Sequence, residues 1–291
     1  MISDPSAQLA FPSIDTPPLR DTRPAAFHLL TWNVQHAAPA RARRQAAWLA
    51  SHEDADVLVL TEVRDAPGGH ALIQALREHG YQVIVPDSAC GEYVVLLATR
   101  VGALQAKPSR LGHLPSRFAA ARVTLGAHSV GVAGLYVPSR GPRQRRNEDK
   151  RAFQEAVSAY LPRLTANLSC GPVVVAGDLN VVDPGHQPHY TIFGDWEYSF
   201  YTDFAAHGFV DAFRELHPKA VEHSWFGRGG NGYRFDHAFI TDQHRGLLRA
   251  CRYLQQPRLE GLSDHAAMTV TLALDRWGEI PPHRSPPSNR V

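Results

Sequence analysis

Nine short segments rich in apolar and β-branched residues constrain the fold of this 291-residue chain more than any other feature. Apolar residues fill consecutive positions in most of them, which is typical of strands whose two faces are both buried. The segments span 27–33, 56–62, 81–86, 93–100, 119–126, 129–138, 171–180, 233–241 and 266–274. The pattern predicts two β-sheets that pack face to face.

Three further segments are predicted helices: Arg41–Ser51, Gly69–His79 and Arg146–Leu164. The third has apolar residues at the spacing of one helix face and charged residues on the opposite face. Amphipathic helices of this kind bury their apolar face against a sheet, so we expect them to cover the outer faces of the sandwich. The predicted fold class is therefore α/β.

Composition sets the expected domain organisation. Hydrophobic residues make up 44 % of the chain, and residues 26–275 contain no evident linker, repeat or low-complexity tract, so we predict one domain over this range. Residues 1–25 and 276–291 are rich in Pro and are expected to form tails that are disordered or lie over the surface.

Charge and cysteine content narrow the function classes. A net charge of +2 does not by itself indicate a nucleic-acid partner. The three cysteines are far apart and lack metal-ligand spacing, which favours a reduced, cytoplasmic setting. Neither a signal-peptide pattern nor an apolar run long enough to span a bilayer occurs, so we expect no membrane association.

The segment VVVAGDLNVV at 173–182 combines a strand buried on both faces with two polar side chains at its end. Side chains alternate along a strand, so Asp178 and Asn180 project to the same side. Gly177 allows the backbone to pass close to another group. Asp and Asn are also ordinary turn residues, and this stretch alone does not decide between a turn and a site.

Five other predicted strands also carry polar residues at one end. In a sandwich, one rim of the sheets would gather these strand ends. The set comprises Asn33, Glu62, Tyr136, Asp178, Asn180, Arg234, Asp236, Asp264 and His265.

Such a rim would hold the parts needed for hydrolysis of a phosphate ester with help from a metal ion. Asn33, Glu62 and Asp264 offer the oxygen ligands that Mg²⁺ prefers. His265 is a natural proton carrier near pH 7, and a buried Asp beside it would orient the ring. The Asp and Asn of GDLN are suited to hold a water molecule.

Six motifs occur in the order typical of the endonuclease/exonuclease/phosphatase superfamily, which the chain resembles over roughly residues 27–274. They are TWN (31–33), LTE (60–62), YVP (136–138), GDLN (177–180), RFD (234–236) and SDH (263–265). The resemblance implies a four-layer α/β/β/α sandwich, in which two packed mixed β-sheets are flanked by helices. Within the superfamily, YVPSRG (136–141) and HSWFG (223–227) look most like exonuclease III and the apurinic/apyrimidinic endonucleases.

For metal and substrate binding, the resemblance implies that Glu62 is the principal ligand of Mg²⁺, or of Mn²⁺, and that Asn33 assists it. Asp264 would lie close to the metal and could bind a second ion. Trp225 would face the deoxyribose, and we expect Arg64 and Arg234 to contact substrate as well.

For the chemistry, the resemblance implies that Asp178 orients or deprotonates the attacking water and that Asn180 positions it. His265 would contact the scissile phosphate and be held by Asp236. Tyr136 would stabilise charge on the phosphate oxygens.

Two departures from the pattern bear on the substrate. Arg64 stands where the family often has Lys. The segment 185–204, read here as a loop, carries acidic residues and no Lys or Arg, whereas the DNA-repair members have a basic, aromatic loop at this place. The Arg-rich stretch 140–151 could follow a nucleic-acid backbone or simply be the solvated start of a helix. His186 and His189 are expected to lie in a solvated loop.

The sequence thus predicts a divalent-metal-dependent phosphodiesterase, with a DNA nuclease of the exonuclease III type as the first interpretation and DNA as the partner. The alternative is the same chemistry on another phosphoester: a 5′-tyrosyl-DNA adduct, a single-stranded or RNA end, or a small molecule. A third class, a nucleic-acid-binding module without activity, would not need Glu62, Asp178 and His265.

Overall fold

The computed structural model describes residues 26–275 except 53–54, 109–110, 142–143 and 169–170, so the two predicted tails lie outside the described residues. Two mixed six-stranded sheets form the centre of the fold. In strand order, the first sheet contains β13 (Leu248–Leu254), β14 (Ala267–Ala273), β1 (Ala26–Asn33), β2 (Val57–Arg64), β4 (Tyr93–Thr99) and β3 (Gln82–Ile84).

The second sheet repeats the same plan, with one parallel pair inside an otherwise antiparallel sheet. The parallel pair is β1–β2 in the first sheet and β7–β8 in the second. In strand order, the second sheet contains β5 (Ala103–Lys107), β6 (Phe118–Leu125), β7 (His128–Tyr136), β8 (Val173–Asp178), β12 (Asp236–Thr241) and β9 (Phe209–Asp211). A short hairpin of β10 (Trp225–Phe226) and β11 (Gly232–Tyr233) stands apart from both sheets.

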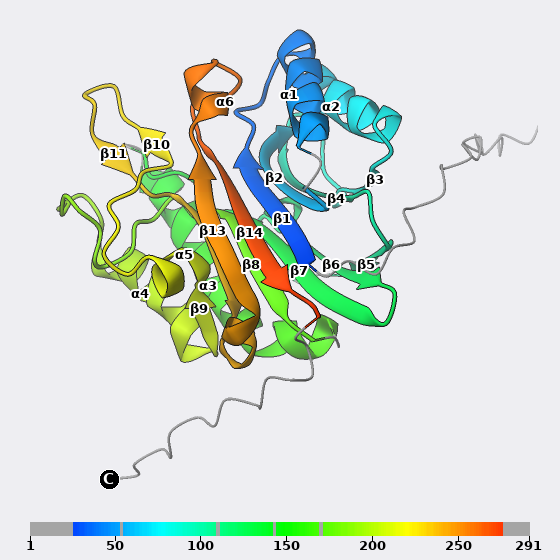
Figure 1. Ribbon diagram of the computed structural model, residues 1–291. Coiled ribbons are helices and arrows are strands. Elements are labelled where there is room, and N and C mark those ends of the chain that lie inside the picture. Colours follow the sequence, from blue (N-terminus) through cyan, green and yellow to red (C-terminus); the bar gives the residue numbers. More distant parts are fainter. Residues whose placement is uncertain (1–25, 53–54, 109–110, 142–143, 169–170, 276–291) are drawn as a thin grey trace, which may run out of the picture.

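Side-chain alternation divides each sheet between two apolar layers. Phe27 and Leu29 of β1 belong to the core between the sheets, whereas Leu30 and Trp32 pack with the helices α1 (Pro39–Ser51) and α2 (Pro67–Glu78). The outer face of the second sheet packs in the same way against α3 (Gln144–Leu168) and α4 (Asp195–Ala206). The predicted four-layer α/β/β/α sandwich is confirmed (Figure 1).

All nine predicted strands and three predicted helices are present, with bounds that shift by a few residues. The interpretation of 185–204 as a loop is wrong in its second half, where α4 forms. Phe200 and Phe204 lie one helical turn apart and pack into the outer core, which provides the apolar face that the acidic composition concealed. The other additions are short or lie at sheet edges: β5, β9, β13, α5 (Ala212–Leu216) and α6 (Gln256–Leu259).

Strand direction brings the polar strand ends to one rim. β1, β2, β7 and β8 end there, and β12 begins there because it runs antiparallel to β8. β14 also begins there, antiparallel to β1, and this rim is the upper one in Figure 1. None of the helices in the described part of the chain is long and apolar enough to cross a membrane.

Gly177 is required where β8 approaches β7 near this rim. Its φ is +142°, and a Cβ atom added there would lie 2.1 Å from the carbonyl oxygen of Leu135. The close approach inferred from the sequence is therefore to the backbone of the neighbouring strand.

We expect Gly177→Ala to lower the free energy of unfolding by about 2–6 kcal/mol, because it combines backbone strain with a steric clash. Gly208→Ala is the matched control: Gly208 has a φ of +79° but no atom within 4 Å of an added Cβ. Urea unfolding of both variants separates the two contributions. Equal losses of stability would show that contact with β7 does not constrain position 177.

Candidate active site

A cavity of about 360 Å³ opens at the rim where the strand ends meet. Eight of the eleven predicted site residues line it: Asn33, Glu62, Tyr136, Asp178, Asn180, Trp225, Asp264 and His265. The other three predicted residues do not line the cavity: Asp236, Arg64 and Arg234. The structure therefore collects at one place side chains that are up to 232 positions apart (33 to 265) in the chain.

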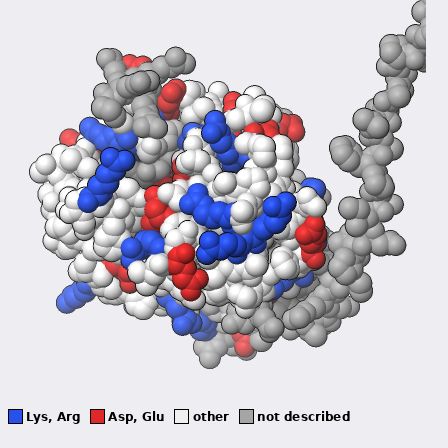
Figure 2. Space-filling view, turned by 90° about the horizontal axis from the view of Figure 1, so that it is seen from above, with Lys and Arg blue, Asp and Glu red and all other residues white. Residues whose placement is uncertain are grey.

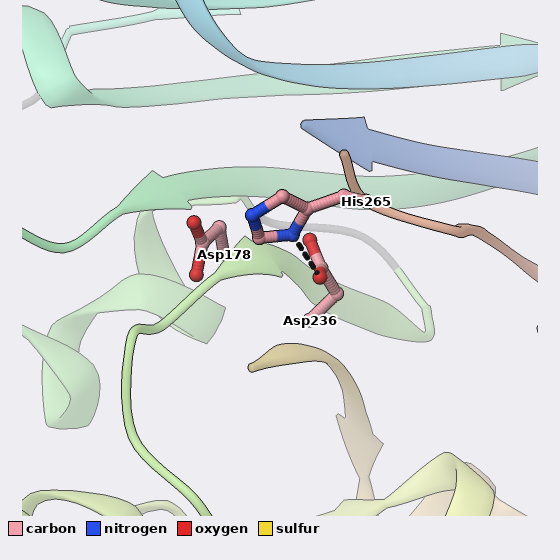
Figure 3. A group of neighbouring side chains, drawn as sticks. All are labelled: Asp178, Asp236 and His265. Atoms are coloured by element: carbon pink, nitrogen blue, oxygen red, sulfur yellow. Dashed lines mark hydrogen bonds and ion pairs between the residues drawn. The ribbon is translucent and has the colours of Figure 1, made fainter. Parts of the chain in front are cut away.

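His265 and Asp236 form a buried pair beside Asp178 (Figure 3). The Nδ1 atom of His265 lies 2.7 Å from Oδ2 of Asp236, and the other ring nitrogen is on the side of Asp178. Burial alone would lower the pKa of His265, but the charges of Asp236 and Asp178 raise it to about 10. The imidazole is therefore a cation at neutral pH.

Asp178 is held by hydrogen bonds from both sides of the sandwich. Its Oδ2 accepts from Nδ2 of Asn33 at 2.8 Å and from Nδ2 of Asn180 at 3.1 Å, and its Oδ1 accepts from the Asn180 amide at 2.9 Å. Burial, reinforced by the charge of Asp236, raises the pKa of Asp178 to about 7. A carboxylate with a pKa close to neutral is well suited to accept a proton.

Glu62 reaches the cavity through an irregularity in β2. The register of β2 against β4 shifts between Leu60 and Val63, and Glu62 has a φ of +58°. This bulge redirects the side chain at the end of the strand. The side chain of Glu62 remains partly exposed, and its Oε1 lies 3.4 Å from Nδ1 of His36.

Asp264 and Trp225 line the cavity and are hydrogen-bonded to each other. The Nε1 of Trp225 donates to Oδ2 of Asp264 at 2.9 Å. The other oxygen, Oδ1, is buried and has no hydrogen-bond partner among the described residues. A buried carboxylate oxygen without a partner is costly in a protein interior unless a ligand or ion satisfies it.

Tyr136 is buried at the end of β7. Its ring packs edge-on against Tyr93, with centroids 5.5 Å apart, and the guanidinium of Arg117 lies 4.5 Å from its centroid. Burial, together with the charges of Glu62 and Asp178, raises the pKa of Tyr136 well above its ordinary value. The phenol therefore keeps its proton and can act as a hydrogen-bond donor.

Two sets of residues at the cavity have the chemistry to bind a cation. Glu62, Asn33 and Asp264 offer oxygen atoms, and the unpartnered Oδ1 of Asp264 fits a hard divalent ion. Among the described residues, Asp178, Asp236 and His265 form one Asp/Asp/His group whose ligand atoms lie within 4.8 Å of one another. In that second set the His265 ring is protonated at neutral pH, and a histidine must lose a proton to bind a metal, so the oxygen set fits a hard cation better.

The prediction that Arg234 contacts substrate is wrong. Its side chain is fully buried behind the site, where Nη2 lies 2.8 Å from Asp183 and Nη1 lies 2.9 Å from Asp211. Burial alone would raise the pKa of Asp211, but Arg234 and His237 hold it far below its ordinary value. A guanidinium that is buried must be paired in this way, which removes it from the cavity.

Arg64 lies outside the cavity lining, and its role in substrate binding stays a prediction. It is exposed at the end of β2 and donates from Nε to the carbonyl of Gly91 at 3.0 Å. The expectation for His186 is also corrected. This ring is buried, with Nδ1 3.0 Å from the carbonyl of Pro188, while Nε2 accepts from the Arg234 amide. His189 is exposed, as expected.

The acidic segment and the Arg-rich stretch meet in the fold. Glu197 of α4 is fully buried and pairs with Lys150 of α3 and with Arg140. Figure 2 shows that Lys and Arg on the face seen from above form separate patches with Asp and Glu among them. Arg143 lies outside the described residues, and no side chain is described for 144–146.

Sequence reasoning missed the apolar wall of the cavity. Four further residues build it: Ile192, Phe193, Tyr233 and Phe235. Tyr233 and Phe235 stack with centroids 5.0 Å apart, and Trp225 lies 5.7 Å from each. The two-residue spacing of aromatics in YRF was the available signal. Ser139 and Arg140 complete the lining.

The chain belongs to the Endonuclease/Exonuclease/phosphatase family, which matches residues 30–265. An exodeoxyribonuclease of Bacillus subtilis is 28 % identical over 134 residues, which cover 41 % of this chain and 52 % of the relative. An exodeoxyribonuclease of Streptococcus pneumoniae is 26 % identical over 136 residues, covering 42 % and 48 %. The matched part spans about half the length of these relatives.

Solved structures share the fold over most of the chain. A 3′ phosphatase from Neisseria bound to a product DNA hairpin has a TM-score of 0.71 at 21 % identity, with 84 % of this chain and 98 % of that chain covered. An AP endonuclease from Archaeoglobus fulgidus has a TM-score of 0.69 at 20 % identity, covering 84 % and 99 %. These likenesses establish the architecture at a low level of sequence identity.

We expect Asp236→Asn to lower the pKa of His265 by about 1–3 pH units, because it removes the nearest charge that favours the imidazolium. The wild-type ring should stay protonated from neutral pH up to about 10. NMR titration of the His265 ring measures both values, and Asp203→Asn, on α4, is the control. An unchanged pKa in Asp236→Asn would show that Asp236 does not hold the charge on His265.

Proposed function

We propose that this protein is a divalent-metal-dependent phosphodiesterase that acts on DNA, of the exonuclease III and apurinic/apyrimidinic endonuclease type. The observation that carries the proposal is that His265 and Asp178 line one cavity, where His265 is paired with the buried Asp236 behind it. The cationic imidazole of His265 therefore lies next to the Asp178 carboxylate, which has a pKa of about 7. Binding alone would require neither.

Asp178 and Asn180 act on the attacking water. Asp178 accepts a proton from it, and Asn180 fixes the position of its oxygen. Hydrogen bonds from Asn33 and Asn180 hold the Asp178 carboxylate in one orientation, so little reorganisation accompanies proton transfer.

His265 and Tyr136 act on the phosphate. The imidazolium of His265, kept charged by Asp236, stabilises the negative charge that develops on the phosphate oxygens. The phenol of Tyr136 donates a hydrogen bond to the same group. Both side chains line the cavity and are almost entirely buried, where such interactions are stronger than in water.

Glu62, Asn33 and Asp264 would hold the metal, with Mg²⁺ or Mn²⁺ as the proposed ion. A bound divalent cation supplies Lewis-acid stabilisation of the phosphate and of the leaving 3′ oxygen. The open Oδ1 of Asp264 and the redirected Glu62 side chain support this assignment.

DNA is the proposed substrate, and a cytoplasmic role in DNA repair is the setting we propose with it. The names of the relatives and the aromatic wall beside the scissile site support DNA. Trp225 lines the cavity, and we expect its indole to pack against the deoxyribose. The described cysteines Cys90 and Cys251 are free thiols, which is consistent with a reducing compartment.

A second candidate keeps the chemistry and changes the substrate. The segment 185–206 supplies Ile192 and Phe193 to the cavity and has no Lys or Arg of its own. A wall of this composition gives little attraction to the backbone of a long duplex. It favours a single-stranded or RNA end, a 5′-tyrosyl-DNA adduct or a small phosphoester.

Glu62→Gln should weaken binding of Mn²⁺ by about tenfold or more, because it removes the charge of the principal ligand. Electron paramagnetic resonance of free Mn²⁺ measures binding without any turnover. Glu78→Gln, at the exposed end of α2, is the control. Wild-type affinity in Glu62→Gln would place the metal elsewhere.

The test of function uses an end-labelled duplex with one abasic-site analogue, and its intact counterpart, each in Mg²⁺ and in EDTA. We expect metal-dependent incision at the lesion or degradation from the 3′ end. Asp178→Asn should lose about 10²–10⁴-fold in rate, whereas the exposed Asp87→Asn should keep wild-type turnover.

More than about a tenth of the wild-type rate in Asp178→Asn would overturn its proposed role as base. If neither duplex is cut but bis(p-nitrophenyl) phosphate is hydrolysed in Mg²⁺, the second candidate replaces the first. If neither the duplexes nor bis(p-nitrophenyl) phosphate is hydrolysed in Mg²⁺ or in Mn²⁺, the chain is not a phosphodiesterase.

A further inference from the structure

One guanidinium stands among the carboxylates that line the cavity. Arg140 is the single Lys or Arg in the cavity lining within the described part of the chain, and Glu62, Asp178 and Asp264 line the same cavity. It lies just beyond β7, four residues after Tyr136. Arg140 has no part in the hydrolysis proposed for the other residues of the cavity.

A fully buried carboxylate anchors Arg140. Its Nη1 lies 2.5 Å from Oε2 of Glu197, whose side chain has no exposed surface. The other oxygen of Glu197, Oε1, lies 2.5 Å from Nζ of Lys150, which is also fully buried. Oε2 also accepts from the Gly194 amide at 2.9 Å. The carboxylate is therefore held rigidly from three directions.

The charges of this cluster do not cancel. Arg140 and Lys150 share one carboxylate, so the three groups together carry one positive charge. Lys150 and Glu197 are shielded from solvent, whereas 39 % of the Arg140 side chain is exposed. The excess charge therefore lies at the exposed Arg140 end, and Arg140 is one of the residues that line the cavity. A guanidinium has five N–H donors, and the hydrogen bond to Glu197 is donated by Nη1.

Lys150 of the same cluster also contacts Asn180, the residue proposed to position the water. Nζ of Lys150 donates to the carbonyl of Asn180 at 2.8 Å. Asn180 has a φ of +49°, and its side chain bonds to Asp178 and to the carbonyl of Val137. Lys150 thus ties the position of Arg140 to the position of Asn180 through one carboxylate.

We propose that Arg140 binds a second phosphate of the substrate, one linkage away from the phosphate held by His265 and Tyr136. This inference deepens the proposed function and rests on it. It makes the substrate an oligonucleotide with at least two phosphates, rather than an isolated phosphodiester. Guanidinium groups suit this role because their planar donors match the geometry of phosphate oxygens.

Arg151 provides the matched comparison within the same Arg-rich stretch. It is exposed on α3, its guanidinium lies 5.1 Å from the ring centroid of Trp196, and it lines a groove between α3 and α4 instead of the cavity. Loss of Arg151 changes net charge as much as loss of Arg140 does. A difference between the two variants therefore reports position rather than charge.

The experiment measures equilibrium binding in EDTA, where no cleavage occurs. The probes are fluorescent DNA duplexes with one abasic-site analogue, in which one neutral methylphosphonate linkage is moved stepwise along the strand that carries the lesion. For the wild-type protein, we expect binding to weaken about tenfold when one particular linkage, next to the cleavage position, is made neutral. Arg140→Gln should bind unmodified DNA about tenfold more weakly and be insensitive to that linkage.

Salt dependence provides a second readout. The slope of log affinity against log salt concentration should fall in magnitude by about 0.9 in Arg140→Gln, the value for one phosphate contact on duplex DNA. Arg140→Lys should keep the slope and recover part of the affinity. Arg151→Gln should bind as the wild type does, and thermal unfolding verifies that all variants fold.

Equal affinity of wild type and Arg140→Gln would overturn the inference. So would equal losses in Arg140→Gln and Arg151→Gln without any linkage-specific effect. Cleavage of the end-labelled duplexes by the wild type in Mg²⁺ tests the proposed function separately. Its absence removes the proposed DNA nuclease function, while the binding series still decides whether Arg140 holds a phosphate.

Discussion

The face-to-face packing of two mixed sheets is the constraint on which the whole site depends. Asp178 and Asp236 belong to one sheet, and Asn33 belongs to the other, as does the segment before β14 that carries His265. The Asn33–Asp178 and His265–Asp236 hydrogen bonds therefore join the two sheets at their common rim. The two hydrogen bonds therefore depend on how the inner core sets one sheet against the other.

Burial gives the polar groups of the rim their chemistry. Asp178 would be an ordinary acid in water, but between two sheets its pKa rises to about 7. Burial alone would lower the pKa of His265, but the charges of Asp236 and Asp178 keep the ring protonated. The two groups thus acquire different protonation states, because burial and a like charge raise the pKa of Asp178 while opposite charges outweigh burial at His265. Buried ion pairs behind the rim, from Arg234 and from Lys150, fix the segments that carry these groups.

The local patterns were sufficient to predict most of the fold and the central part of the site. Strands that are buried on both faces have apolar residues at consecutive positions, so the sequence pattern predicts β1, β2, β4, β7 and β8. The helix α4 was missed because its acidic composition outweighed the spacing of Phe200 and Phe204. Arg234 was misplaced because its partners, Asp183 and Asp211, come from segments 51 and 23 positions away. The Arg140–Glu197 contact was hidden for the same reason.

The sequence by itself determined which residues can end a strand at the rim, since alternation and strand direction follow from local patterns and from the order of the motifs. Only the tertiary structure decided which charges face the cavity. It buried Arg234, neutralised Lys150 with Glu197, and left Arg140 at the cavity lining. The physical reason is that a charged side chain can be buried only where the fold places an opposite charge beside it. Such pairs join residues far apart in the sequence, so they depend on how the layers pack.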